Sequence, residues 1–189
     1  IPGSGGGVSV DFSDGANPSV TGAVTREVWL QTPAAGTSDL RAFFISAGSS
    51  NGSEWLGSLK GPSNYGEDFS ARLSGDIIPK ESGSFTFHIA GRGVCELHLN
   101  AAEIDSEDHV ATIDEEAWNH VANLGEASSQ SSSTFNLTAG TRYYFEVLQV
   151  ARQGDDHIAI GWDTPSSSGI EVIPGDSLSP LETFTSSNA

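Results

Sequence analysis

Carboxylate side chains form the clearest chemical pattern in this sequence. Asp105, Glu107 and Asp108 fall within four residues, at nearly alternating positions in a polar segment. Calcium prefers several oxygen ligands, and this spacing could wrap such a cation. The segment lacks the glycine and the distal glutamate of a helix-loop-helix calcium motif. A bound calcium ion is therefore a hypothesis for this cluster, and no cofactor is required.

The other reactive side chains do not form a catalytic pattern. The sequence has no His-Glu-x-x-His motif and no phosphate-binding loop. With 25 acidic residues, a carboxylate pair for glycoside hydrolysis can always be picked out, so such a pair predicts nothing. His88 and His98 are expected on the outward faces of adjacent strands, where they would meet, but no third zinc ligand is evident. We predict that the protein is not an enzyme.

The acidic excess of the chain excludes some classes of partner. The 189 residues include 25 acidic and 8 basic side chains, which give a formal net charge of −17. Such a surface repels phosphate backbones and anionic membranes, so nucleic acid is not a predicted partner. It suits cations, neutral glycans or plain solubility in an extracellular setting. No apolar run approaches the ~20 residues that a membrane-spanning helix needs.

Other features point to an extracellular or cell-surface protein. Asn51 and Asn136 begin Asn-x-Ser/Thr sequons, which makes them predicted glycosylation sites. Cys95 is the single cysteine, and its neighbours place it on the buried face of a strand, so we predict a core thiol. The chain begins at Ile1 without a methionine or a signal-peptide pattern, which is expected of a processed product.

Short strands are the elements that would position these residues. Phe85 and Phe87 alternate with polar residues, as do Cys95 and Leu97, and the short segment 90–94 between the two runs predicts a hairpin. Many short strands separated by turns predict an all-β fold, an antiparallel β-sandwich or jelly roll with long polar loops. One helical turn is expected around 114–120. The expected strands after residue 30 cover 68–76, 84–90, 94–99, 133–137, 141–151 and 157–163.

Seven pieces of the sequence form a recognisable series, in the order 26–29, 69–75, 81–87, 95–100, 137–144, 157–162 and 172–174. Together they resemble the β-sandwich domain family first defined in anthrax protective antigen. That family recurs in yeast flocculins and epithelial adhesins, in bacterial adhesins and as glycosidase inserts. The resemblance implies a sandwich over 23–181, preceded by a glycine-rich leader at 1–22 and followed by a tail at 182–189.

The resemblance also implies a place for calcium. Sugar-binding members of the family hold this ion with two adjacent aspartates in the loop after the Phe-Thr-Phe-like strand. Aligned without gaps, those two positions fall on Arg92 and Gly93 of this chain. Because Arg92 brings a fixed positive charge to the place of the cation, calcium-dependent sugar binding is not expected at this loop.

A second loop of the family corresponds to residues 152–156. Here the chain has Gln153 and an adjacent pair of carboxylates, Asp155 and Asp156. Arg92 would neutralise one of the pair through a charge-assisted contact, and a solvated acidic turn is the alternative. The resemblance thus makes Arg92, Gln153, Asp155 and Asp156 predicted glycan-binding residues.

The aromatic residues divide into two groups. Trp55, Tyr65 and Trp118 lie in polar, turn-rich stretches and are expected to be more exposed than Trp29 and Trp162. The latter two match framework positions of the family, which implies that they fill the core. Trp55 and Trp118 are candidates for stacking on the apolar face of a sugar, with packing against a loop as the alternative for each.

Two functions remain open from the sequence. The first is a non-catalytic structural or adhesion subunit, in which Val8, Val10 and Phe12 would add as a strand to the sheet edge of another copy. Such head-to-tail donation builds a filament, unless the leader folds back on its own domain. The second is a carbohydrate-binding module of an adhesin or glycosidase, with or without calcium, whose partners are cell-surface glycans. The missing aspartate pair slightly favours the first.

Overall fold

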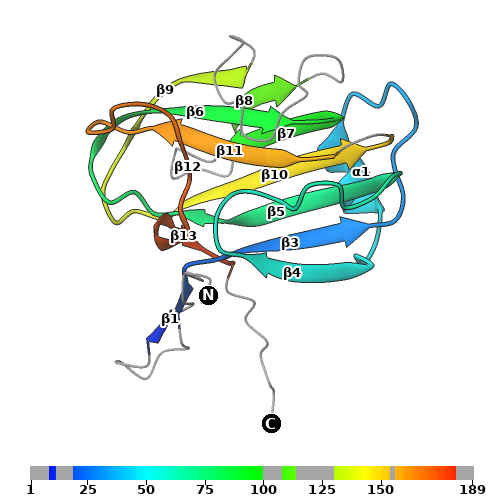
Figure 1. Ribbon diagram of the computed structural model, residues 1–189, viewed down its shortest axis with the longest axis horizontal. Coiled ribbons are helices and arrows are strands. Elements are labelled where there is room, and N and C mark those ends of the chain that lie inside the picture. Colours follow the sequence, from blue (N-terminus) through cyan, green and yellow to red (C-terminus); the bar gives the residue numbers. More distant parts are fainter. Residues whose placement is uncertain (1–8, 12–18, 100–107, 114–129, 154–155, 182–189) are drawn as a thin grey trace.

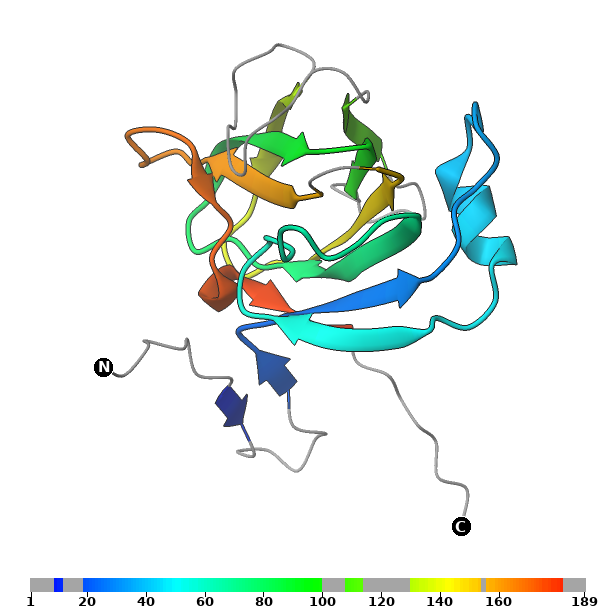
Figure 2. The same ribbon diagram turned by 45° about the vertical axis from the view of Figure 1, so that its right-hand side comes forward.

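The fold consists of two antiparallel β-sheets packed face to face (Figures 1 and 2). The computed structural model describes residues 9–11, 19–99, 108–113, 130–153 and 156–181. This architecture confirms the predicted all-β sandwich. A separate two-stranded sheet joins β1 (Ser9–Asp11) to β2 (Ser19–Thr21).

The larger sheet has the strand order β4-β3-β5-β10-β7-β8, and β13 pairs with β5 as well. The smaller sheet has the order β12-β11-β6-β9. The larger sheet comprises β3 (Val24–Trp29), β4 (Gly52–Leu56), β5 (Phe69–Ile77), β7 (Val94–Leu99), β8 (Asp108–Ile113), β10 (Tyr143–Ala151) and β13 (Leu178–Ser179). The smaller sheet comprises β6 (Gly83–Gly91), β9 (Ser131–Leu137), β11 (Ile158–Asp163) and β12 (Glu171–Val172). A 3-10 turn, η2 (Gly175–Ser177), precedes β13.

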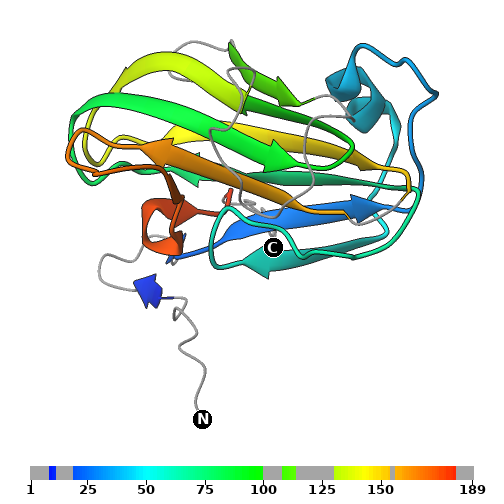
Figure 3. The same cartoon turned by 45° about the horizontal axis from the view of Figure 1, so that its top comes forward.

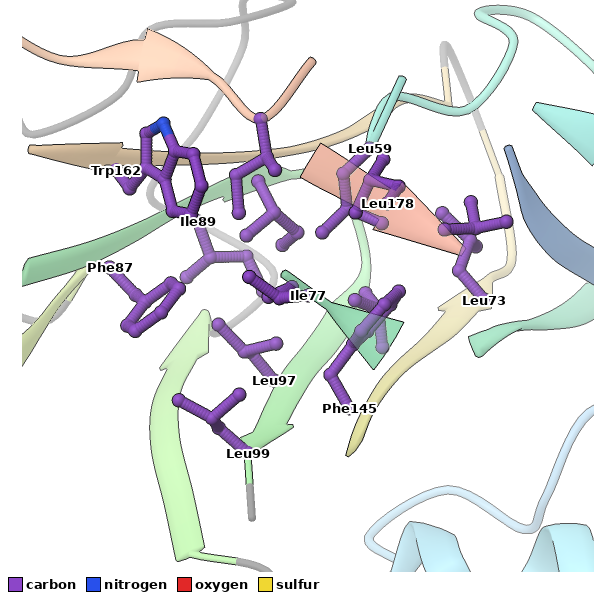
Figure 4. Packing of buried hydrophobic residues seen from close by; sticks show 14 of the residues in the cluster. Leu59, Leu73, Ile77, Phe87, Ile89, Leu97, Leu99, Phe145, Trp162 and Leu178 are labelled. Atoms are coloured by element: carbon purple, nitrogen blue, oxygen red, sulfur yellow. The ribbon is translucent and has the colours of Figure 1, made fainter. Parts of the chain in front are cut away.

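The core lies between the two sheets and follows the alternation of the strands (Figure 4). Phe85, Phe87 and Ile89 of β6 and Leu97 of β7 are at most 1% exposed. Trp162 of β11 lies against the two phenylalanines, with ring centroids 5.3 and 6.4 Å apart. Burial of each such side chain stabilises the fold by about 1.5–3 kcal/mol. The alternation of apolar residues therefore fixes which face of each strand points into the core, and with it the register of the strands.

The predicted hairpin of β6 and β7 is wrong. β6 pairs with β11 and β9, whereas β7 pairs with β10 and β8 in the other sheet. The short segment between them therefore crosses from one sheet to the other. Both arrangements keep every second side chain in a core, so alternation alone does not separate a hairpin from a crossing connection.

The histidines of these two strands consequently do not meet across a hairpin. His88 lies in the smaller sheet, where its Nδ1 is 2.9 Å from Ser131 Oγ and its Nε2 is 3.2 Å from Asp163 Oδ2. His98 lies in the larger sheet, with its Nε2 3.0 Å from Glu96 Oε2. Each imidazole thus belongs to a different local network, and the expectation of a histidine pair is wrong.

The one α-helix of the described residues is α1 (Leu40–Ser46), at one end of the sandwich (Figure 3). Asp39 caps it by accepting a hydrogen bond from the Ala42 amide at 2.9 Å. Leu40 and Phe44 pack with Trp29 in a second apolar cluster, which also includes residues of β10. The helical turn expected around 114–120 lies outside the described residues. No described helix has the length and apolar character needed to cross a bilayer.

The aromatic side chains are distributed as expected where the structure describes them. Trp29 and Trp162 are 2% and 3% exposed, whereas Trp55 and Tyr65 are 58% and 47% exposed. Trp118 lies outside the described residues. Cys95 is a buried free thiol, as predicted.

Candidate functional site

β6 and β10 end at the same end of the sandwich (Figure 1). Three chain segments surround a hollow there. One is the crossing segment from β6 to β7, the second is the connection from β10 to β11, and the third precedes β5. The hollow has a volume of about 470 Å³. Its described lining consists of Asp68, Arg92, Gly93, Ala151, Arg152, Gln153 and Asp156.

Gly93 determines the shape of the first segment. Its φ of +88° lies in the left-handed region that favours glycine. A Cβ at this position would lie 2.1 Å from the carbonyl oxygen of Val150, which is far closer than atoms approach in proteins. An aspartate at Gly93 therefore does not fit this backbone. The neighbouring position is occupied by Arg92, so this segment does not hold the pair of adjacent aspartates that the resemblance placed here.

Arg92 joins the first two segments of the site. Its backbone amide donates to the carbonyl oxygen of His157 at 3.0 Å, so the β6–β7 and β10–β11 connections are held together. The half-buried side chain of Arg92 lines the hollow. Its guanidinium carries a permanent positive charge and presents N–H groups but no acceptor. The site thus has a fixed cation where related domains were expected to have a metal.

Asp156 organises the third segment. Its carboxylate, in a residue only 3% exposed, accepts a hydrogen bond from the Gly66 amide at 3.0 Å, and its backbone carbonyl accepts one from the Asn64 amide at 2.9 Å. The Asp68 amide donates to the carbonyl oxygen of Arg152 at 2.9 Å. Asp156 therefore lines the hollow and also fixes the loop that carries Asp68.

Sequence reasoning missed this third segment. Asn64 and Asp68 have positive φ values of 55° and 52°. Asparagine and aspartate tolerate this conformation better than other residues with side chains, so the polar run 63–68 held a signal of a sharply shaped loop. That signal did not indicate which part of the fold the loop would touch.

Gln153 and Arg152 play different parts at the hollow. Gln153 is exposed, so its amide can both donate and accept hydrogen bonds. Arg152 turns its guanidinium toward another loop, where Nη2 donates to the Pro33 carbonyl at 2.7 Å and Nη1 to Thr32 Oγ1 at 3.3 Å. Arg92, Gln153 and Asp156 thus come together, as the alignment of the two loops led us to expect. Asp155 lies outside the described residues.

A larger hollow of about 850 Å³ lies between β7, β10 and the loop before α1. Val94 and Val150 contribute to its lining, and the Arg152 guanidinium and the Glu96–His98 pair add polar groups. This space belongs to the outer face of a single sheet. We place the candidate site at the smaller hollow because loops from both sheets converge there.

The predicted calcium cluster and the sequons are only partly described. Asp105 and Glu107 lie outside the described residues, and Asp108 is the first residue of β8. Within the described part of the chain, no three His, Cys, Asp or Glu side chains are grouped as metal ligands would be. Asn51 and Asn136 are both exposed, and each side-chain oxygen accepts a hydrogen bond, from the Leu30 amide and from Ser84 Oγ. Glycosylation of these two residues stays a prediction.

The predicted assembly strand is described only around Val10. This residue belongs to β1, where it pairs with Val20 of β2 in the same chain. Val8 and Phe12 lie outside the described residues. The partner of β1 is therefore another segment of the leader, in a sheet separate from the sandwich, and strand donation to a second copy stays a prediction.

Comparison with protein families identifies one match that covers most of the chain. The model of the PA14 domain family matches residues 18–176. A curated mouse protein, N-acetyl-beta-glucosaminyl-glycoprotein 4-beta-N-acetylgalactosaminyltransferase 1, is 32% identical over 103 residues. That match covers 52% of this chain and 10% of the mouse protein, so the chain spans about a tenth of the relative's length.

Solved structures share the fold at low sequence identity. The A domain of epithelial adhesin 9 from Candida glabrata, in complex with Galβ1-3GlcNAc, matches with a TM-score of 0.62 at 13% identity, covering 86% of this chain and 91% of that one. A PA14 sugar-binding domain from an RTX adhesin has a TM-score of 0.62 at 14% identity, covering 85% and 99%. The PA14 domain of the MpAFP antifreeze protein has a TM-score of 0.59 at 13% identity, covering 85% and 91%.

Proposed function

This chain belongs to the PA14 domain family, and we propose that it is a non-catalytic carbohydrate-binding domain of an extracellular or cell-surface protein. The observation that carries the proposal is the hollow in which Arg92, Gln153 and Asp68 converge from three connections. Relatives of the same fold support it, because two of them are described as sugar-binding or were solved with a sugar.

The hollow offers the complementary groups that sugar hydroxyls need. Each hydroxyl can donate one hydrogen bond and accept others. The Arg92 guanidinium would donate to a hydroxyl oxygen, the Asp68 carboxylate would accept from a hydroxyl, and the Gln153 amide can do both. A few such groups in a concave site fix the orientation of a small ligand. Two adjacent hydroxyls of one sugar ring are the simplest ligand for this set.

A neutral sugar suits the site better than an acidic one. The chain carries a formal net charge of −17, and the carboxylates of Asp68 and Asp156 lie at the hollow itself. An anionic sugar would be repelled by this field, in spite of the local charge of Arg92. We therefore infer that the ligands are neutral glycans and that binding needs no calcium, because Arg92 and Gly93 leave no room for the metal-binding pair.

A glycan array tests this proposal. We expect the purified chain to bind neutral oligosaccharides equally in calcium and in a chelator. We expect the variants Arg92→Ala and Gln153→Ala to bind them more weakly. Trp55→Ala is the matched control, because Trp55 is exposed on β4 and does not line the hollow. Binding that vanishes in chelator would contradict the calcium-free site, and no binding to any neutral glycan would overturn the proposal.

The filament hypothesis has weaker support than carbohydrate binding. Its donor strand includes Val10, and β1 pairs within the chain. Light scattering of the purified protein separates the two functions. A monomer of 19.7 kDa is expected of a binding domain. Long polymers would instead support assembly by strand donation as the main function.

A further inference from the structure

Tyr65 lies in the loop that borders the candidate hollow. In this loop Asp68 lines the hollow, and the Gly66 amide donates a hydrogen bond to the Asp156 carboxylate. Tyr65 directly precedes Gly66 and is 47% exposed, although it is one of the larger apolar side chains. A single exposed aromatic side chain is common on protein surfaces, so the contacts and the position of the Tyr65 ring decide what it can do.

One face of the Tyr65 ring is covered by a buried cation. The Arg26 guanidinium carbon lies 4.4 Å from the ring centroid, and Arg26 itself is 1% exposed. The Phe69 ring approaches edge-on, with centroids 5.1 Å apart and planes at 67°. Arg26 Nη1 forms an ion pair with Glu54 Oε1 at 2.5 Å, and its Nε has no partner among the described residues. The cation–π contact with Tyr65 is thus a main interaction of this guanidinium.

The loop that carries Tyr65 is held rigidly against the hollow. The amides of Asn64 and Gly66 donate hydrogen bonds to the backbone carbonyl and the carboxylate of Asp156, at 2.9 and 3.0 Å. The amide of Asp68 donates one to the carbonyl oxygen of Arg152 at 2.9 Å. Two of these residues have positive φ, a conformation that restricts the loop further. A ring fixed in this way loses little conformational entropy when a ligand covers it.

We propose that the exposed part of the Tyr65 ring is a stacking platform for a second sugar ring, in an oligosaccharide whose first ring occupies the hollow. The inference rests on the proposed function and extends it to ligands of at least two neutral sugar rings. Sugars combine hydroxyl edges with apolar C–H faces, and an aromatic ring matches the latter. The hollow supplies polar groups, and Tyr65 supplies an aromatic ring, which the described lining of the hollow does not contain.

Binding constants for one-ring and two-ring sugars test the proposal. The probes are galactose, which has one ring, and the neutral disaccharides Galβ1-3GlcNAc, Galβ1-4GlcNAc and β-lactose, with further mono- and disaccharide pairs from the array. Tyr65→Leu is the informative variant, because leucine still covers Arg26 but has no ring. We expect Tyr65→Leu to weaken disaccharide binding about three- to tenfold and to leave monosaccharide binding unchanged.

Two further variants separate stacking from a structural role. Tyr65→Phe keeps the ring and should bind both classes of sugar like the wild type. Gln153→Ala, which changes the hollow, should weaken both classes equally. Unchanged disaccharide binding by Tyr65→Leu, or equal losses for one and two rings, overturns the platform and leaves the hollow intact as a site. A wild-type chain that binds no neutral glycan overturns the platform together with the proposed function.

Discussion

Replacement of Gly93 by alanine is the sharpest test of how the candidate site is built. Gly93 has a φ of +88°, and a Cβ there would lie 2.1 Å from the Val150 carbonyl oxygen and 3.1 Å from its carbonyl carbon. Both contacts are with the backbone of β10, which is paired on both sides and cannot move as a flexible side chain could. We therefore expect Gly93→Ala to destabilise the domain strongly.

Two contributions determine the magnitude. Placing a residue with a side chain in the left-handed region costs about 1–2 kcal/mol. Forcing an additional carbon into a well-packed region costs about 1–3 kcal/mol more. The free energy of unfolding should thus fall by about 2–5 kcal/mol in Gly93→Ala. A change of this size lowers the melting temperature of a chain of this length by roughly 2–4 °C for each kcal/mol.

Gly140→Ala provides the matched control. Gly140 has a similar φ of +75°, but a Cβ there would meet no atom within 4 Å. Only the conformational cost applies, so this variant should lose about 1–2 kcal/mol. Urea unfolding of the wild type and both variants, with equal m-values, measures the difference as a shift in the midpoint.

Equal destabilisation by the two alanine variants would refute the reasoning, because the close approach to Val150 would then have no energetic effect. A second variant links this test to function. Gly93→Asp recreates one member of the missing aspartate pair and should give no calcium binding by titration calorimetry. Tight calcium binding by that variant would mean that the segment can reshape around a cation.

Three other predictions concern individual side chains. Hydrogen bonds from Thr164 and then Ser166 lower the pKa of Glu81 below its ordinary 4.5. The ionised Glu81 carboxylate therefore stabilises the folded state above pH 4.5, and this stabilisation is lost as the pH falls through the lowered pKa of the folded state. Urea midpoints of Glu81→Gln should therefore depend less steeply on acid pH than those of the wild type. Burial, and then the charge of a neighbouring glutamate, raises the pKa of the Cys95 thiol, so a thiol reagent at neutral pH should label Cys95 only as fast as the chain unfolds. Leu97→Ala should cost about 2–5 kcal/mol in urea unfolding, because Leu97 is fully buried, and a smaller loss would mean that the core collapses around the gap.

Local patterns were sufficient for most strands of the fold. The expected strand 94–99 coincides with β7, and the expected 68–76 is one residue from β5. The strands that were missed include β4, in a turn-rich stretch, and β8, in an acidic one. All four described residues of β4 before Leu56 are exposed, so this edge strand has no alternation of apolar residues to reveal it.

The candidate site was foreseen in part. Arg92 and Gln153 were named from the two connections that resemble binding loops, and the structure brings them to one hollow. The loop with Tyr65 and Asp68 was not connected with them. This loop is distant in the sequence from Arg92 and Gln153. It is attached to the site by a hydrogen bond from the Gly66 amide to the buried carboxylate of Asp156.

The sequence by itself determined the class of fold, the faces of the central strands and the acidic surface, because these depend on period-2 alternation and on counts of charges. Only the tertiary structure decided that β6 and β7 belong to opposite sheets. Only it placed Gly93 against the backbone of Val150 and stacked Tyr65 on Arg26. The physical reason is that alternation specifies which side chains are buried but not which surface they are buried against, and the site depends on contacts between segments distant in the chain.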